Sequence, residues 1–264
     1  MADDSVVSSA FLATSWPVEK LETVDSTSLE AHRRASDGVR GPLWIVVDEQ
    51  TAGKGRSGRA WVSKQGNLYS TALLPLNKLD KTVPVLALTI GLAVFDTVKL
   101  LSNGCILPGL KWPNDVRVNN AKISGILLET GSFNDGGLWL SIGIGINLVH
   151  SPEIEGYLTT NIANEGGPVV PTDQAIVCLD DRVRTRMRQH FQAGTQSIIA
   201  DWMAYSDQVG QRCRANARSG PVEGDFVGLD EIGQLLLRND AGELITISAG
   251  DVNLIRETTH ASGN

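Results

Sequence analysis

A twelve-residue stretch from Gln50 to Trp61 has the residue types of an anion-binding loop. Its three glycines let the backbone approach a ligand closely or adopt a positive φ. Lys54, Arg56 and Arg59 alternate with these glycines, so we expect the cations to converge on one concavity. Backbone amides and fixed positive charges together form a receptor for phosphate or carboxylate. A solvated surface loop is the alternative, because short glycine motifs are weak signals.

The loop matches neither of the two common nucleotide motifs. It lacks the Gly-Lys-Ser/Thr end of a Walker A loop, and no Gly-x-Gly-x-x-Gly sequence opens a helix here. The other polar segments of the chain must therefore indicate which ligand the loop binds.

A second polar cluster, Lys111-Trp112-Pro113-Asn114-Asp115, places a cation, an amide and a carboxylate in five residues. Pro113 fixes its own φ and biases Trp112 toward extended geometry, which stiffens the segment. Asn114 and Asp115 offer oxygen atoms to Mg²⁺, which takes few protein ligands beside phosphates. A turn after the proline is the evenly weighted alternative.

Two further segments are candidates to face the same ligand. Lys122 precedes an apolar run and Gly125, a position from which an ammonium can stabilise a developing anion, although most lysines are solvated. Gly143 and Gly145 interrupt a β-branched run that ends at Asn147. Such glycines admit a planar ligand or a second backbone, with a bulge beside the core as the alternative. Asn147 is a candidate contact to metal or phosphate.

The sequence offers no nucleophile of its own. The histidines stand in no metal-ligand spacing, and we find no Gly-x-Ser-x-Gly elbow or arguable Cys/His pair. An anion site with few acid–base groups suits activation of a carboxylate by ATP, because positioning and charge neutralisation dominate that chemistry.

The elements that must position these residues follow from periodicity and turn signals. Residues 43–47, 67–74 and 138–148 are predicted strands, and Asn119-Asn120 is a predicted hairpin turn. Residues 83–101 show apolar positions at helical spacing and predict a core helix; 173–191 and 195–204 are also predicted helices. Ser26 or Thr27 is expected to cap an earlier helix.

The composition changes near residue 207. Short β-type runs at 211–216, 222–229, 234–238 and 243–248 are separated by glycines and predict a small antiparallel β-barrel. We therefore expect a catalytic domain over residues 1–206 and a C-terminal barrel over residues 207–258. The barrel has no catalytic signature, so a packing lid is its favoured interpretation.

Bulk properties exclude several classes of protein. The chain has 264 residues, 42% hydrophobic residues and a net charge of −7, which indicates a soluble globular protein and argues against a broad nucleic-acid surface. Three dispersed cysteines fit a reducing cytoplasm. We see no signal peptide and no uninterrupted apolar run of membrane-spanning length, so we expect no membrane segment.

Together, five motifs resemble those of the biotin–protein ligases in order and spacing. They are Asp25-Ser26-Thr27, the loop from Gln50 to Trp61, Lys111 to Asp115, Lys122 to Leu127, and Gly143 to Asn147. The resemblance spans residues 20–256 and implies the mixed α/β domain of biotin and lipoate ligases, with helices packed on a β-sheet. It also implies a two-step reaction: biotin and ATP, with Mg²⁺, give biotinyl-5′-adenylate. The biotinyl group then passes to a lysine of the biotin carboxyl carrier domain of a biotin-dependent carboxylase.

The resemblance further implies residue roles. Lys122 and Arg56 are the implied catalytic residues. The implied biotin-binding set is Ser26, Thr27, Gln50, Gly53, Lys54, Arg56, Lys122, Gly125, Gly143 and Gly145. The implied ATP-binding set is Arg56, Arg59, Trp61, Lys111, Asn114 and Asn147, with Asp115 as a candidate metal ligand.

Two residues depart from the family pattern. Ser28 stands where Asn is common, and Lys54 stands where the loop usually has Arg. Lysine keeps the charge but loses the planar fork, so we expect looser retention of the adenylate.

Only about 25 residues precede Ser26, too few for the repressor domain of some members, so we expect no DNA binding. Family members are monomers or homodimers. A lipoate–protein ligase and a non-catalytic biotin- or nucleotide-binding protein are the alternative functions.

Overall fold

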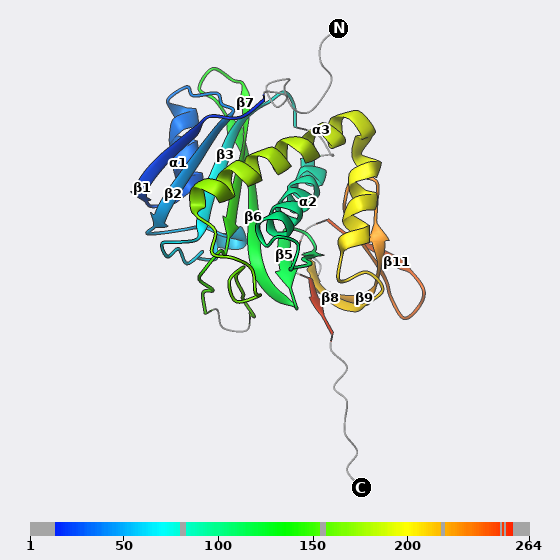
Figure 1. Cartoon of the computed structure of the whole chain (residues 1–264). Coiled ribbons are helices and arrows are strands. Elements are labelled where there is room, and N and C mark those ends of the chain that lie inside the picture. The colour runs from blue at the N-terminus through cyan, green and yellow to red at the C-terminus, as the bar shows by residue number, and fades with distance from the viewer. Residues whose placement is uncertain are drawn as a thin grey trace.

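A seven-stranded mixed sheet forms the centre of the protein (Figure 1). The computed structural model describes residues 14–79, 83–153, 157–217, 220–248, 250 and 252–255. The strand order is β1-β2-β3-β7-β6-β5-β4. β1 and β2 are parallel, and the other neighbouring pairs are antiparallel. The strands are β1 (Val18–Val24), β2 (Leu43–Gln50), β3 (Leu68–Leu76), β4 (Gly109–Lys111), β5 (Asp115–Val118), β6 (Ala121–Ser132) and β7 (Leu138–Ile146).

Helices cover both faces of this sheet. α1 (Thr27–Ser36) lies on one face, and α2 (Val83–Leu101) and α3 (Thr172–Tyr205) lie on the other (Figure 1). Alternating residues of β2 divide accordingly, because successive side chains of a strand point to opposite faces. Trp44 and Val46 join the large core with α2 and α3, whereas Ile45 packs with Ala31 and Ala35 of α1. The predicted helices-on-sheet architecture is confirmed.

α2 is the core helix that the apolar spacing predicted. Among the described residues it alone is long and apolar enough to cross a membrane, yet 67% of its most apolar window is buried inside the protein. It packs against α3 and the sheet. Its hydrophobicity is therefore accounted for by the core.

Local signals located most other elements. Asn119 and Asn120 form the β5–β6 hairpin turn with φ of 50° and 66°, as predicted. α3 is interrupted at Gly194, with φ of 78°, which matches the two predicted helices. β3 was predicted to stop before Pro75 but continues to Leu76. β2 pairs with β3 only up to Leu73 of β3. Pro75 therefore lies beyond the part of β3 that pairs with β2, where a residue without a backbone N–H is tolerated.

The C-terminal strands form an open antiparallel sheet. They are β8 (Arg212–Ala217), β9 (Gly220–Leu229), β10 (Leu235–Arg238), β11 (Leu244–Ile247) and β12 (Val252–Leu254), in the order β11-β10-β9-β8-β12. The antiparallel arrangement is confirmed, but the expected barrel is not closed: within the described part of the chain, β11 and β12 are opposite edges. β12 escaped prediction because three residues carry too little pattern.

This C-terminal sheet is attached next to the Lys111–Asp115 segment. The Trp112 indole donates to the Gly233 carbonyl at 3.0 Å, and its backbone amide donates to Gln208 Oε1 at 3.0 Å. Arg117 of β5 pairs with Asp207 through two hydrogen bonds. These contacts place the second sheet beside the β4–β5 hairpin, and hence beside the predicted site.

Candidate active site

One cavity of about 460 Å³ collects most of the predicted site residues. The cavity lies at the start of α1. Thr71 of β3 and Gly143 of β7 line it from the sheet, and the loop after β2 forms another part of its wall. Gly53 and Asn147 are the two predicted site residues that do not line it. Those that do are Ser26, Thr27, Gln50, Lys54, Arg56, Arg59, Trp61, Lys111, Asn114, Asp115, Lys122, Gly125, Gly143 and Gly145.

Uncharged polar groups form one part of the wall, which we call the neutral end: Ser26, Thr27, Ser28, Gln50 and Thr71. Gln50 Oε1 accepts from the Thr27 amide at 2.9 Å and from the Thr27 hydroxyl at 3.2 Å. Thr71 Oγ1 donates to Thr27 Oγ1 at 2.8 Å. Neutral groups that both donate and accept suit an uncharged polar ring system.

Ser26 occupies the N-cap position of α1, but its hydroxyl makes no capping hydrogen bond. That hydroxyl lies 3.0 Å from the Ser28 hydroxyl, and both side chains line the cavity. Ser28 was not predicted as a site residue. The signal available was its place one residue after the Ser26-Thr27 motif, on the first turn of α1.

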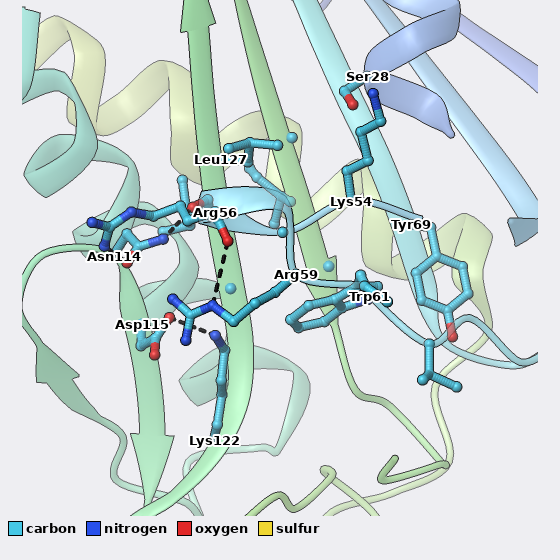
Figure 2. Close-up of a pocket in the computed structure, with 18 of the residues that line it drawn as sticks. Ser28, Lys54, Arg56, Arg59, Trp61, Tyr69, Asn114, Asp115, Lys122 and Leu127 are labelled. Atoms are coloured by element: carbon cyan, nitrogen blue, oxygen red, sulfur yellow. Dashed lines mark hydrogen bonds and ion pairs between the residues drawn. The ribbon is translucent and has the colours of Figure 1, made fainter. Parts of the chain in front are cut away.

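Charged side chains and their polar partners form the opposite part of the wall, which we call the charged end: Arg56, Lys111, Asn114, Asp115, Lys122 and Tyr157. Figure 2 shows Arg56, Asn114, Asp115 and Lys122 of this end. The Lys122 ammonium lies 2.6 Å from Asp115 Oδ1. Arg56 Nη1 donates to Asn114 Oδ1 at 2.7 Å. The Lys122 side chain is only 17% exposed, unlike a typical solvated lysine. Desolvation strengthens the field of such cations on a bound anion.

The glycine loop folds back on itself and carries Arg56 at its tip. The Trp61 amide donates to the Gly53 carbonyl at 2.8 Å, and the Gly55 amide donates to the Arg59 carbonyl at 2.7 Å. A side chain at Gly53 would meet the Trp61 carbonyl at 2.4 Å, so this glycine permits the fold of the loop. Its place outside the cavity lining follows from that packing.

The three cations of the loop do not all converge. Arg56 and Arg59 extend toward the charged end, whereas Lys54 extends toward Ser28 at the neutral end (Figure 2). A hydrogen bond from His32 lowers the pKa of Glu129, and the charge of Lys54 lowers it further. All three cations line the same cavity, as expected, but they extend toward different ends of it.

Gly125 of β6 and Gly145 of β7 leave space for a planar group, and the Trp61 indole occupies that space. Gly125 and Gly145 are paired across the two strands. A Cβ at Gly145 would lie 2.6 Å from the indole, and one at Gly125 would lie 2.8 Å from it. At Gly143 the nearest atom to such a Cβ is 3.5 Å away, an ordinary van der Waals contact, and no contact with the indole is among the nearest.

Asn147 lies outside the cavity lining and is buried. Its amide donates to the Thr160 carbonyl at 2.9 Å, and its backbone amide donates to the Ile123 carbonyl. These bonds tie the end of β7 to the segment around Thr160. The position does not favour the ATP contact that we expected for Asn147.

The described residues do not form a metal site from protein ligands alone. They contain no group of three or more His, Cys, Asp or Glu side chains that could hold one. Asp115, the predicted ligand, has Oδ1 paired with Lys122 and Oδ2 accepting from Tyr157 at 2.9 Å. Mg²⁺ is therefore expected to enter the site as part of the nucleotide substrate.

The C-terminal sheet borders the charged end directly. Val252 of β12 lines the cavity, and Asn253 Oδ1 accepts from Lys111 Nζ at 3.3 Å. Arg56 Nη2 donates to the Gly250 carbonyl at 3.2 Å. The sheet therefore contacts two site cations, which a lid that only packed on the core would not do.

Comparisons with known proteins agree with this geometry. The profile of the Biotin/lipoate A/B protein ligase family matches residues 21–147, and that of the biotin protein ligase C-terminal domain matches residues 209–254. A biotin–[acetyl-CoA-carboxylase] ligase of Paracoccus denitrificans is 31% identical over 234 residues, covering 87% of this chain and 97% of that protein. The chain belongs to the biotin/lipoate A/B protein ligase family.

Solved ligase structures share the fold over nearly the whole chain. The biotin protein ligase from Aquifex aeolicus in complex with biotin and ATP aligns with a TM-score of 0.78 and 28% identity, covering 91% of this chain and 99% of that one. The Leishmania major enzyme in complex with biotinyl-5-AMP gives a TM-score of 0.61 at 27% identity, covering 88% and 99%.

Proposed function

We propose that this protein joins biotin to ATP as biotinyl-5′-adenylate and then transfers the biotinyl group to a lysine of a biotin carboxyl carrier domain. One observation carries the proposal: a single cavity has a neutral polar end and a strongly cationic end. Biotin has the same division, with an uncharged ureido ring system and a carboxylate on a chain. Relatives that are biotin ligases by name, and solved ligases with biotin and ATP, support this function.

In the first step, a carboxylate oxygen of biotin attacks the α-phosphorus of ATP. The new P–O bond forms as the bond to the β-phosphate oxygen breaks, and pyrophosphate leaves. Lys122 and Arg56 are the proposed catalytic residues, because their cations face the junction at which negative charge accumulates. Arg59, Lys111, Asn114 and Trp61 are the proposed ATP contacts. Preorganised charges of this kind stabilise the transition state without later rearrangement.

In the second step, the ε-amine of a carrier lysine attacks the acyl carbon of the adenylate. The amide forms, the amine loses a proton, and AMP leaves with the electron pair of the cleaved bond. The nucleophile belongs to the partner, which fits the lack of a sequence motif for a nucleophile in this chain. We place the reaction in the cytoplasm, with the catalytic domain ending near residue 206.

The neutral end favours biotin over lipoate as the substrate. The dithiolane ring of lipoate has no strong donor or acceptor, so it would leave the Ser26 and Ser28 hydroxyls without ligand partners. The ureido group offers both N–H donors and a carbonyl acceptor. For the same reason, Ser26, Thr27 and Gln50 are the proposed ring contacts, while Gly143 lines the open wall between the two ends.

Mass spectrometry of a carrier domain tests the proposal. The protein is incubated with biotin, MgATP and the carrier, and one biotinyl group per carrier is expected, with pyrophosphate released. Omission of ATP is the control, and lipoate replaces biotin in a parallel reaction. Labelling by lipoate alone would favour a lipoate ligase. Biotin binding without pyrophosphate release would instead indicate a binding protein, and either result would contradict the proposal.

A further inference from the structure

Tyr157 occupies the centre of the charged end, although none of the sequence motifs includes it. Its hydroxyl accepts a hydrogen bond from Lys111 Nζ at 2.8 Å and donates one to Asp115 Oδ2 at 2.9 Å. The other oxygen of Asp115 pairs with the Lys122 ammonium at 2.6 Å. The Tyr157 hydroxyl therefore contacts Lys111 directly and is linked to Lys122 through the Asp115 carboxylate.

We propose that Tyr157 is a positioning residue for adenylate formation: it fixes Asp115, and through Asp115 the direction of the Lys122 ammonium. This inference rests on the proposed biotin-activating function. A carboxylate held at only one oxygen can rotate, whereas Asp115 is held at both. A side chain that hydrogen-bonds to a reactive group commonly fixes the orientation of that group. Loss of such a side chain reduces activity although the reactive group is still present.

The aromatic ring of Tyr157 contributes separately from its hydroxyl. Its centroid lies 4.9 Å from Lys111 Nζ and 5.7 Å from Lys122 Nζ. Both distances are within the range of a cation–π attraction. The ring therefore stabilises two neighbouring like charges, while the hydroxyl fixes the carboxylate between them. Replacing tyrosine by phenylalanine separates these two contributions.

Backbone hydrogen bonds explain why Tyr157 reaches this point. The Lys122 amide donates to the Leu158 carbonyl at 2.8 Å, and the Thr160 amide donates to the Lys122 carbonyl at 2.9 Å. Residues 157–160 thus run beside the start of β6, paired with Lys122 itself. The backbone pairing that positions Lys122 therefore also places the Tyr157 phenol beside the Lys122 side chain.

The C-terminal sheet holds the other end of this network. Lys111 Nζ donates to Asn253 Oδ1 of β12 as well as to Tyr157. Lys111 and Asp115 are buried, with 6% and 9% exposure, so water competes little for these bonds. The phenol oxygen is consequently held between a fixed donor and a fixed acceptor.

The test compares Tyr157→Phe with wild type in pyrophosphate release at saturating biotin and MgATP. We expect the turnover number to fall about 10- to 100-fold, since small misplacements of reacting groups have effects of this size. The dissociation constant of biotin should change less than about twofold, because the neutral end is untouched. Tyr205→Phe, at the half-exposed end of α3, is the matched control and should match wild type.

A double-mutant cycle with Asp115→Asn separates positioning from a general structural effect. If Tyr157 acts through Asp115, the Phe substitution should have almost no further effect in the Asn background. Equal reductions in both backgrounds would overturn the positioning role, as would an active Tyr157→Phe protein. Wild-type protein that releases no pyrophosphate would instead overturn the proposed function, and the positioning role with it. Melting temperatures within a few degrees of wild type confirm that the variants are folded.

Discussion

The two ends of the cavity are built in different ways. The neutral end consists of buried hydroxyls and an amide on α1, β2 and β3, bonded to one another. The charged end draws on the glycine loop, the β4–β5 hairpin, the segment at Tyr157 and the C-terminal sheet. Its cations are paired with protein acceptors and carboxylates. One end is a fixed receptor of neutral groups, and the other is a set of cations that these contacts hold in position.

This difference separates binding from chemistry. A fixed receptor of neutral groups contributes equally to substrate and transition state, so its loss should weaken binding alone. Cations that face the reacting atoms stabilise charge that develops only in the transition state, so their loss should reduce turnover. Substitutions at the two ends should therefore have separable kinetic effects.

The largest effect is expected at Lys122. Lys122→Ala removes the partly buried ammonium and leaves the Asp115 carboxylate without that cation, with only its Tyr157 hydrogen bond retained. We expect adenylate formation to fall at least about 10²- to 10³-fold, the loss typical of one transition-state donor, with biotin still bound. Pyrophosphate release measures the rate, and isothermal titration measures the binding. The exposed Lys99→Ala is the control; a Lys122 variant with nearly full turnover would place the chemistry elsewhere.

Arg56 should control retention of the activated intermediate. Arg56→Gly removes the guanidinium that contacts Asn114 and the Gly250 carbonyl, so the adenylate should escape about 10- to 100-fold faster, given the usual strength of charged hydrogen bonds. Escape is measured as biotinylation of an unrelated protein in the mixture. Arg56→Lys, which keeps charge but not the fork, should be intermediate. Labelling confined to the carrier in the glycine variant would contradict this role.

Sequence patterns located the two ends unequally. At the neutral end, Ser26, Thr27 and Gln50 were predicted and line the cavity, whereas Ser28 and Thr71 were not predicted. At the charged end, Tyr157 is the residue that the prediction missed. Tyr157 lies 35 positions after Lys122 and reaches it through a parallel bridge, a long-range pairing without a local pattern. β12 and its contact to Lys111 were missed because three residues carry too little pattern. Glycine-separated runs predicted the antiparallel strands but do not specify closure, and within the described residues the sheet is open.

At the neutral end, Thr27→Val should affect binding without affecting turnover. Valine has a similar shape but leaves the Gln50 amide oxygen and the Thr71 hydroxyl with fewer partners. We expect the dissociation constant of biotin to rise about tenfold, the effect of one lost buried hydrogen bond, with an unchanged rate at saturation. Thr23→Val on the exposed side of β1 is the control. A lower saturated rate would show that the two ends are not separable.

Gly143 and Gly145 provide a smaller test within one strand. A Cβ at Gly145 would collide with the Trp61 indole at 2.6 Å, whereas one at Gly143 would make ordinary van der Waals contacts, the nearest at 3.5 Å. Gly145→Ala should therefore raise the KM for ATP several-fold through displacement of the indole, at a cost of about 1–3 kcal/mol in stability. Gly143→Ala should instead weaken biotin binding and leave stability unchanged. Identical effects of the two alanines would argue against a distinct role for Trp61.

The smallest effect is expected at Asp25, which supports the neutral end through its bond to the Ser26 amide. A hydrogen bond from Arg33 lowers the pKa of Asp25 from 3.8 to about 2. Since the folded value is the lower one, the contribution to stability is present above pH 3.8 and is lost as the pH falls toward 2. The carboxylate is 40% exposed, so solvent screening limits it to about 0.2–1 kcal/mol. Urea unfolding of Asp25→Asn should show this deficit at pH 5 and little of it at pH 2, where wild-type Asp25 is itself becoming protonated. A deficit of equal size at both pH values would assign the effect to the shape of the side chain, and would contradict a role for the Asp25 charge in supporting the neutral end.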